Sequence, residues 1–470
     1  MTDDIRSVEE ELAAAEAEMM GNGSRRREPP RDGSPPHAVD DRVRPSIGSI
    51  DKVVEVFQEW LYIPDARVVD VTLATYTAHH RRGDPLWTAI VGASGGGKTE
   101  PIRALEVMPD AYMLSKLTPQ TFASGLKNNP RASLLTRLEE DKQSFVIMKD
   151  FTSILSMHRD AQRELLADLR EIYDGAFDKD FGSGESVHWR GRLGLLLGVT
   201  PEMDQARKVN EIMGERFVYY RLPKADRRKL VKKAQDNRGR ESEMRQALTD
   251  AVAGFLADVE FERTVELSEE PETRMLALAD LATLGRSHVA RDRNHEVLTL
   301  PTPEAPTRFV KQLGALADSL MVLGRDEAQA MELVEKISLD SLPPPRLACI
   351  RFLIENAGDV VKTTDVANAV KLPPTTCGRV LEDLTALRMA DREGSGQDLR
   401  WMPTEYVVDL WNEAGIGGSE SSAPEATQGA VDQARPDPGS ESSEICPECE
   451  WSNPGEHHFG CRHYEKGTTK

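Results

Sequence analysis

The chain has 470 residues, a net charge of −20 and 39% apolar residues. Since a single hydrophobic core seldom grows past roughly 250 to 300 residues, the length predicts two or three domains. The negative charge argues against a surface coated with phosphate-binding groups, so any contact with nucleic acid must be made through local patches or a pore.

The polar excess is concentrated at the two ends of the chain. Residues 1–47 hold an acidic Glu/Ala stretch and a Pro-, Gly- and Arg-rich run, and residues 413–444 are rich in Gly, Ser, Glu and Pro. Such segments bury too little apolar surface to offset chain ordering, so both are expected to be disordered. The sequence shows neither a run of about 18 apolar residues nor a secretory signal, which predicts a soluble, cytoplasmic protein without a membrane partner.

The strongest motif follows an apolar strand, Trp87–Val91, and precedes a helical stretch, Ile102–Val107. It has the pattern G-x-x-x-x-G-K-T. In this pattern glycines let backbone N–H groups wrap phosphates, the lysine reaches the β and γ oxygens, and the hydroxyl binds Mg²⁺. A flexible turn is the alternative, but the strand-loop-helix context favours an ATP and Mg²⁺ site. Its residues are Gly92, Ala93, Ser94, Gly95, Gly96, Gly97, Lys98 and Thr99.

A second apolar strand, Ser144–Met148, predicts the other half of the nucleotide site. In P-loop ATPases such a strand ends in an acid that holds Mg²⁺ or polarises water. Here Lys149-Asp150 stands where an Asp-Glu pair is usual. Asp150 is the predicted essential carboxylate, as a Mg²⁺ ligand or as the group that activates water. Because Lys149 occupies the preceding position, a slow ATPase stays open.

The order of the later features resembles AAA+ ATPases, particularly the branch of the minichromosome-maintenance helicases and MoxR-type ATPases, over roughly residues 50–340. By this resemblance, Phe177–Arg190 occupies the position of a hairpin that such helicases project into a central pore. Its candidate DNA contacts are Lys179, His188 and Arg190. A structural hairpin with solvated charges is the alternative for each.

Further site residues follow from the same resemblance. Thr200 corresponds to the sensor that positions the attacking water, or it merely ends its strand. Arg216, with Arg221 as second choice, is the predicted arginine finger for a neighbour's γ-phosphate, against a plain salt bridge. Arg308 would face the bound nucleotide, or it is a helix-start arginine of no special role. An arginine supplied between subunits implies a homo-oligomeric ring, a hexamer by resemblance.

Residues 345–407 have the element order of a winged helix-turn-helix and resemble many bacterial regulator domains. The start of its recognition helix and its wing are expected to contact DNA. A protein-docking winged helix is the alternative, which Glu382 and Asp383 favour. The candidate DNA contacts are Thr375, Thr376, Arg379, Arg392 and Arg400.

The last segment contains a Cys-x-x-Cys pair and a Cys-x-His pair. Thiolate and imidazole in this number suit tetrahedral Zn²⁺, which could fold a segment too short for a core of its own. Unpaired thiols in a disordered tail are the alternative, and an odd total of five cysteines does not suggest a disulfide framework. The predicted ligands are Cys446, Cys449, Cys461 and His463.

These elements predict an α/β fold class: a P-loop AAA+ parallel sheet flanked by helices, then a helical lid, a winged-helix domain and a short zinc-binding tail. The predicted function is an ATP-hydrolysing DNA helicase or translocase of the phage or mobile-element replication type. Two alternatives stay open, namely an ATP-regulated DNA-binding factor or helicase loader with slow turnover, and a MoxR-like remodelling ATPase without a DNA role. The predicted boundaries are 1–47 for the N-terminal segment, 48–223 for the ATPase core, 224–340 for the lid, 341–412 for the winged helix, 413–444 for the linker and 445–470 for the tail.

Overall fold

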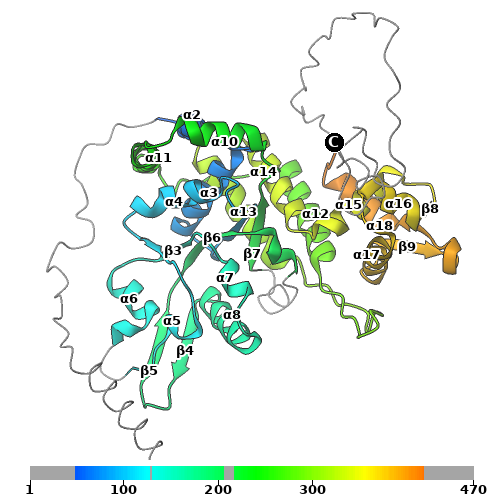
Figure 1. The fold of residues 1–470 in the computed structure, drawn as a ribbon, viewed down its shortest axis with the longest axis horizontal. Helices are drawn as coiled ribbons and strands as arrows, with labels where there is room; N and C mark the ends of the chain where they lie inside the picture. Colours follow the sequence, from blue (N-terminus) through cyan, green and yellow to red (C-terminus); the bar gives the residue numbers. More distant parts are fainter. Residues whose placement is uncertain (1–47, 127–129, 206–215, 418–470) are drawn as a thin grey trace, which may run out of the picture. The chain divides into compact units, whose positions relative to one another are not determined.

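The structure is a computed structural model that describes residues 48–126, 130–205 and 216–417. A five-stranded parallel sheet forms its centre (Figure 1). The strand order is β2-β3-β6-β1-β7, so the first strand in the chain lies between the last two. Four of the strands are almost wholly buried, as expected for a parallel sheet covered on both faces. The strands are β1 (Trp87–Val91), β2 (Ala111–Met113), β3 (Phe145–Met148), β6 (Gly194–Val199) and β7 (Phe217–Arg221).

Alternate residues of each strand point to opposite faces, and each face has its own apolar cluster. Ile90 lies in the first cluster and Ala89 in the second. The first cluster is completed by α2 (Ile50–Trp60), α3 (Arg67–His80), α11 (Glu241–Leu256), α12 (Glu269–Arg286), α13 (Thr307–Val322) and α14 (Glu327–Asp340). The second is completed by α5 (Pro119–Phe122), α6 (Leu134–Glu140), α7 (Thr152–Leu155), α8 (Arg159–Tyr173) and the hairpin of β4 (Ala176–Asp180) and β5 (Ser186–Arg190).

The helices of the predicted lid, 224–340, belong to this same architecture. α11 to α14 share the first apolar cluster with α2, α3 and one face of the sheet, so their core is continuous with that of the sheet. Phe309 and Leu313 of α13 are fully buried there. The exception is α10 (Arg227–Asp236), which has no buried residue.

The C-terminal region, 344–413, combines four helices with a three-stranded antiparallel sheet of order β8-β10-β9. Helices followed by a small antiparallel sheet agree with the element order predicted for residues 345–407. The indole of Trp401 is fully buried and donates a hydrogen bond to the Thr363 hydroxyl at 2.8 Å, which ties β10 to α16. The elements are α15 (Pro344–Glu355), β8 (Val361–Lys362), α16 (Thr363–Val370), α17 (Pro374–Ala386), β9 (Ala390–Glu393), β10 (Arg400–Pro403) and α18 (Glu405–Glu413).

Two buried arginines join the C-terminal region to the preceding helices through one carboxylate. Arg291 contacts Asp383 of α17 at 2.6 Å and Glu382 at 3.1 Å. Arg346 contacts the other Asp383 oxygen at 3.0 Å and donates to two backbone carbonyls of residues 285–287. Glu382 and Asp383 therefore have partners inside the chain. Their negative charge no longer favours the hypothesis that this region docks onto another protein.

An apolar cluster also crosses the predicted boundary between residues 340 and 341. Leu281, Val289 and Leu339 pack with the core of the C-terminal region. The predicted lid and the predicted winged helix therefore do not have separate cores, because both regions contribute side chains to one apolar cluster.

The described helices include none with the length and apolar character needed to cross a membrane. The predicted zinc ligands Cys446, Cys449, Cys461 and His463 lie outside the described residues.

Replacement of Asp383 by Ala is expected to lower the free energy of unfolding by about 2 to 3 kcal/mol, because it leaves two mostly buried guanidinium groups without their shared carboxylate. Urea denaturation of the full chain measures this change. Asp391→Ala, at an exposed position of β9, is the matched control and should change the value by no more than about 0.5 kcal/mol. Equal effects of both variants would contradict the proposed role of Asp383.

Candidate nucleotide-binding site

The loop Gly92–Thr99 leaves the carboxyl end of β1, an interior strand of the sheet. Gly95 and Gly97 have φ of +72° and +89°, which side chains with a Cβ rarely adopt. A Cβ on Gly96 would come within 3.0 Å of the Ala93 carbonyl, whose oxygen accepts the Gly96 N–H. These three glycines therefore permit the tight turn of the loop.

Lys98 is 6% exposed and its ammonium lies inside the loop. It donates to the carbonyl oxygens of Gly92 at 3.1 Å and Ala93 at 3.2 Å. Burial lowers the pKa of Lys98, and the charge of Asp150 opposes that shift. A desolvated cation whose partners among the described residues are carbonyl oxygens is suited to exchange these acceptors for anionic oxygens.

Asp150 and Thr200 reach the same edge of the sheet as the loop, because parallel strands all present their carboxyl ends there. Asp150 follows β3, is exposed, and accepts the backbone N–H of Thr152 at 2.9 Å. The Thr152 and Thr200 hydroxyls are 3.3 Å apart. Four predicted residues, Lys98, Thr99, Asp150 and Thr200, therefore belong to one edge.

Two further residues at this edge, Thr152 and Gly198, are not predicted from the sequence. Thr152 contacts both Asp150 and Thr200, and a hydroxyl two positions after the acid is its only signal. Gly198 allows β3 and β6 to approach, because a Cβ there would lie 2.6 Å from the Lys149 carbonyl. Its signal is a glycine inside an otherwise apolar strand.

The helical stretch after the loop begins three residues before the predicted Ile102 and changes its type within the predicted range. α4 covers Thr99–Arg103 and gives way to a 3-10 turn, Ala104–Val107. Thr99 is its first residue and is half-buried. Thr99 thus follows Lys98 directly at the start of the helix, as the motif requires.

Arg216 lies at the opposite, amino edge of the sheet, directly before β7. Its guanidinium is 2.7 Å from Asp174 and stacks over the Tyr173 ring at 5.4 Å, and the residue is 4% exposed. Arg221 is held by Asp204 at 2.7 Å. Either arginine would have to exchange its carboxylate before reaching a phosphate of another chain.

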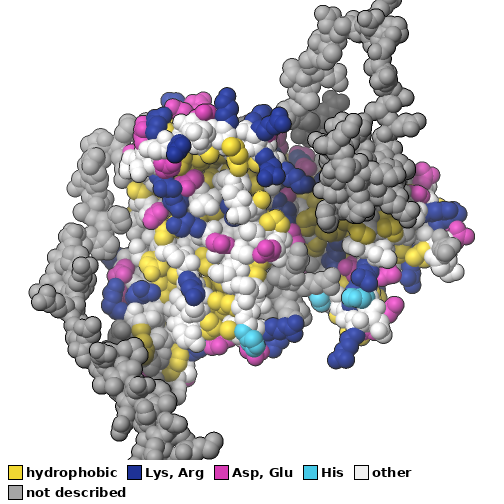
Figure 2. All heavy atoms as spheres, in the orientation of Figure 1, with side chains coloured by type: hydrophobic (Ala, Val, Ile, Leu, Met, Phe, Trp, Pro, Cys, Tyr) yellow, Lys and Arg dark blue, Asp and Glu magenta, His cyan; other side chains and the backbone are white. Residues whose placement is uncertain are grey.

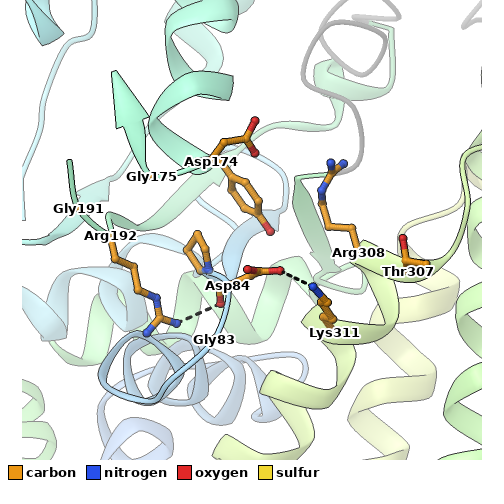
Figure 3. Close-up of a pocket in the computed structure, with 11 residues that line it drawn as sticks. Gly83, Asp84, Asp174, Gly175, Gly191, Arg192, Thr307, Arg308 and Lys311 are labelled. Atoms are coloured by element: carbon orange, nitrogen blue, oxygen red, sulfur yellow. Dashed lines mark hydrogen bonds and ion pairs between the residues drawn. The ribbon is translucent and has the colours of Figure 1, made fainter. Parts of the chain in front are cut away.

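Arg308 lies near the same amino edge, beside a hollow of about 460 Å³ (Figure 3). It contacts Glu304 at 2.7 Å, while Lys311 contacts Asp84 at 3.2 Å just before β1 begins. The loop Gly92–Thr99 lies at the other end of β1. The length of β1 therefore separates Arg308 from the loop of its own chain, and the expectation that Arg308 faces a nucleotide stays a prediction.

The charges of the β4–β5 hairpin have carboxylate partners. Asp178 contacts His188 at 2.9 Å and Arg190 at 2.6 Å across the strand pair, and the hydrogen bond from Arg190 is the main reason that the pKa of Asp178 falls to about 2. Lys179 contacts Glu164 and Asp168 of α8, each at 3.0 Å. The structural alternative for these three residues thus gains support, while DNA contact stays a prediction.

In the C-terminal region the candidate DNA contacts lie on the surface. The start of α17 and the two wing strands expose polar and cationic side chains, since α17 buries only Cys377, Leu381 and Leu384. The exposed residues are Thr375, Thr376, Arg379, Arg392 and Arg400.

Comparisons with models of known protein families and with curated protein sequences give no match for this chain.

Gly97→Ala is expected to weaken binding of a fluorescent ATP analogue at least tenfold, because a Cβ at φ +89° shifts the backbone N–H groups of the loop. Titration of the full chain with the analogue measures the affinity. Gly324→Ala introduces a similar strain at φ +99° in the turn after α13, with no atom within 4 Å of the added Cβ. This control should bind as the original chain does, and equal losses in both variants would refute the assignment of the loop.

Proposed function

We propose that the chain is an ATP-hydrolysing P-loop motor of the AAA+ type that acts on DNA in the cytoplasm as a helicase or translocase. The observation that carries the proposal is the convergence of Lys98, Asp150 and Thr200 at the carboxyl edge of a parallel sheet, around a glycine-rich loop. Such edges hold ligands in open α/β sheets.

The loop fits a nucleotide triphosphate with Mg²⁺. Glycine backbone at residues 95–97 leaves no Cβ in the loop, and the desolvated Lys98 donates to carbonyl oxygens that a phosphate could replace. Backbone N–H groups and Lys98 would bind phosphate oxygens, and Thr99 with Asp150 would hold the ion. Mg²⁺ supplies charge neutralisation between the phosphates.

Asp150 and Thr200 are the residues that would activate the attacking water. Asp150 is exposed next to the loop and is oriented by the Thr152 N–H, so its carboxylate can accept a proton from water or hold an ion. Thr200, next to Thr152, can orient the same water by its hydroxyl. Lys98 holds the phosphate that this water would attack.

In a ring of identical subunits, the amino edge of the sheet could contact the nucleotide of a neighbouring subunit. Arg216 and Arg308 lie at the edge opposite the loop of their own chain, so a phosphate that either contacts would belong to another copy. The carboxylates of Asp174 and Glu304 hold them in the single chain. We propose that a neighbouring nucleotide replaces these carboxylates and couples hydrolysis to assembly.

A slow nucleotide switch that controls DNA binding is the second candidate function. Lys149 stands beside Asp150, and the hairpin cations already pair with acids of their own chain. The exposed face of α17 and the wing would then be the main contact with DNA. A switch requires ATP binding but little turnover.

ATP binding and hydrolysis by the full chain test the proposal. Lys98→Ala should abolish both, because the phosphates lose their only buried cation. Asp150→Asn should retain binding but lower turnover by about 100-fold or more, since the carboxylate acts on the reacting groups. Glu139→Gln, an exposed carboxylate beyond the site, is the control and should retain both activities. Tight binding without turnover in the unaltered chain would contradict the motor and favour the switch.

A further inference from the structure

The most basic segment of the described chain is α10, Arg227–Asp236, and it packs no residue into a core. Arg228 and Lys229 form one pair and Lys232 and Lys233 a second pair three to five residues later, so the four cations share one side of the helix. Within the part of the chain that the structure describes, none of the four has a carboxylate within ion-pair distance. The charges of this stripe are therefore not neutralised by a carboxylate of the described residues.

Many other lysine and arginine side chains are neutralised by a carboxylate of the same chain. Lys179, Arg190, Arg216, Arg221 and Arg291 each contact a carboxylate at 3.1 Å or less. In a protein of net charge −20 the remaining surface repels a polyanion. An unpaired stripe is therefore the kind of local patch that a nucleic-acid contact would require.

The contacts of α10 place it beside the nucleotide loop. Lys229 lies 6.0 Å above the Tyr62 ring, and the Tyr62 carbonyl is the nearest atom to a Cβ added at Gly97. At its end, Asn237 donates to the Trp60 carbonyl and Arg240 stacks on the Trp60 ring at 4.5 Å. Figure 2 shows Lys and Arg side chains gathered at the top of the view, where Figure 1 places α10.

We infer that α10 binds the phosphate backbone of DNA through this stripe. The inference rests on the proposed action on DNA but needs neither ATP turnover nor the C-terminal region. The stripe from Arg228 to Lys233 extends roughly 8 Å along the helix, enough for two or three successive phosphates of one strand. Its position next to Tyr62 would connect DNA binding to the nucleotide loop.

Other partners fit less well. The opposite side of α10 offers only Leu230, Val231 and Ala234, too small an apolar surface for insertion into a membrane interface. A single nucleotide would engage one or two cations and leave the rest without acceptors. A long polyanion satisfies all four.

Fluorescence anisotropy of labelled single- and double-stranded oligonucleotides, across a range of salt concentrations, tests the inference on the full chain. The triple variant Arg228→Gln, Lys229→Gln and Lys232→Gln should bind about tenfold more weakly at low salt. Its salt dependence, the slope of log affinity against log salt, should fall by roughly two to three because each phosphate contact contributes about 0.9. Circular dichroism checks that the variant is folded.

Two controls separate local contact from net charge. Arg159→Gln, Arg163→Gln and Arg170→Gln remove three exposed charges from α8 and should leave affinity within about twofold. Arg228→Lys, Lys229→Arg and Lys232→Arg keep the charge on α10 and should restore binding.

Equal DNA binding by the original chain and the α10 variant would overturn the inference while leaving the proposed function in place. Loss of affinity for a fluorescent ATP analogue with unchanged DNA binding would assign the stripe to the nucleotide. Loss of self-association in sedimentation, with unchanged DNA binding, would assign it to a second copy. No DNA binding by the original chain would instead refute the proposed action on DNA.

Discussion

The structure depends on one constraint, the burial of β1 between two parallel neighbours. Because β6 and β7 pair with it in register, the Gly92 N–H donates to Val199 and the Leu222 N–H donates to Val91, so both sides of the loop entrance are fixed. A chain that leaves an interior strand of such a sheet must turn sharply, and glycines with positive φ permit the turn. Asp150 and Thr200 then reach the same edge because their strands run parallel to β1.

The sequence predicts this edge well, for a physical reason. Fully buried parallel strands are continuous apolar runs, and the residues that follow them must share an edge, so Trp87–Val91, Ser144–Met148 and Leu193–Val199 are enough to group Lys98 with Asp150 and Thr200. The same argument finds the elements of residues 345–407 from helical spacing and turn residues. Neither inference needs knowledge of long-range side-chain contacts.

The other edge shows where sequence reasoning fails. A helix-start arginine carries no mark of which end of the sheet it meets, and Arg308 is placed by the contact of Lys311 with Asp84, 227 positions away in the chain. Likewise, nothing local indicates that Lys179 pairs with α8 or that Asp383 binds two arginines. Ion pairs between distant segments determine which charged side chains are neutralised within the chain. The charged side chains that are not neutralised can bind another molecule.

The described chain thus has one sheet edge that carries the glycine-rich loop, an opposite edge that carries Arg216 and Arg308, and two exposed cationic surfaces, on α10 and on the C-terminal region. The proposed motor requires nucleotide bound at the first edge to respond to DNA bound at the cationic surfaces. ATP turnover by the full chain, measured with and without single- and double-stranded DNA, tests this coupling most directly. The account predicts that DNA raises the turnover rate severalfold. A rate that is the same with and without either form of DNA would contradict it.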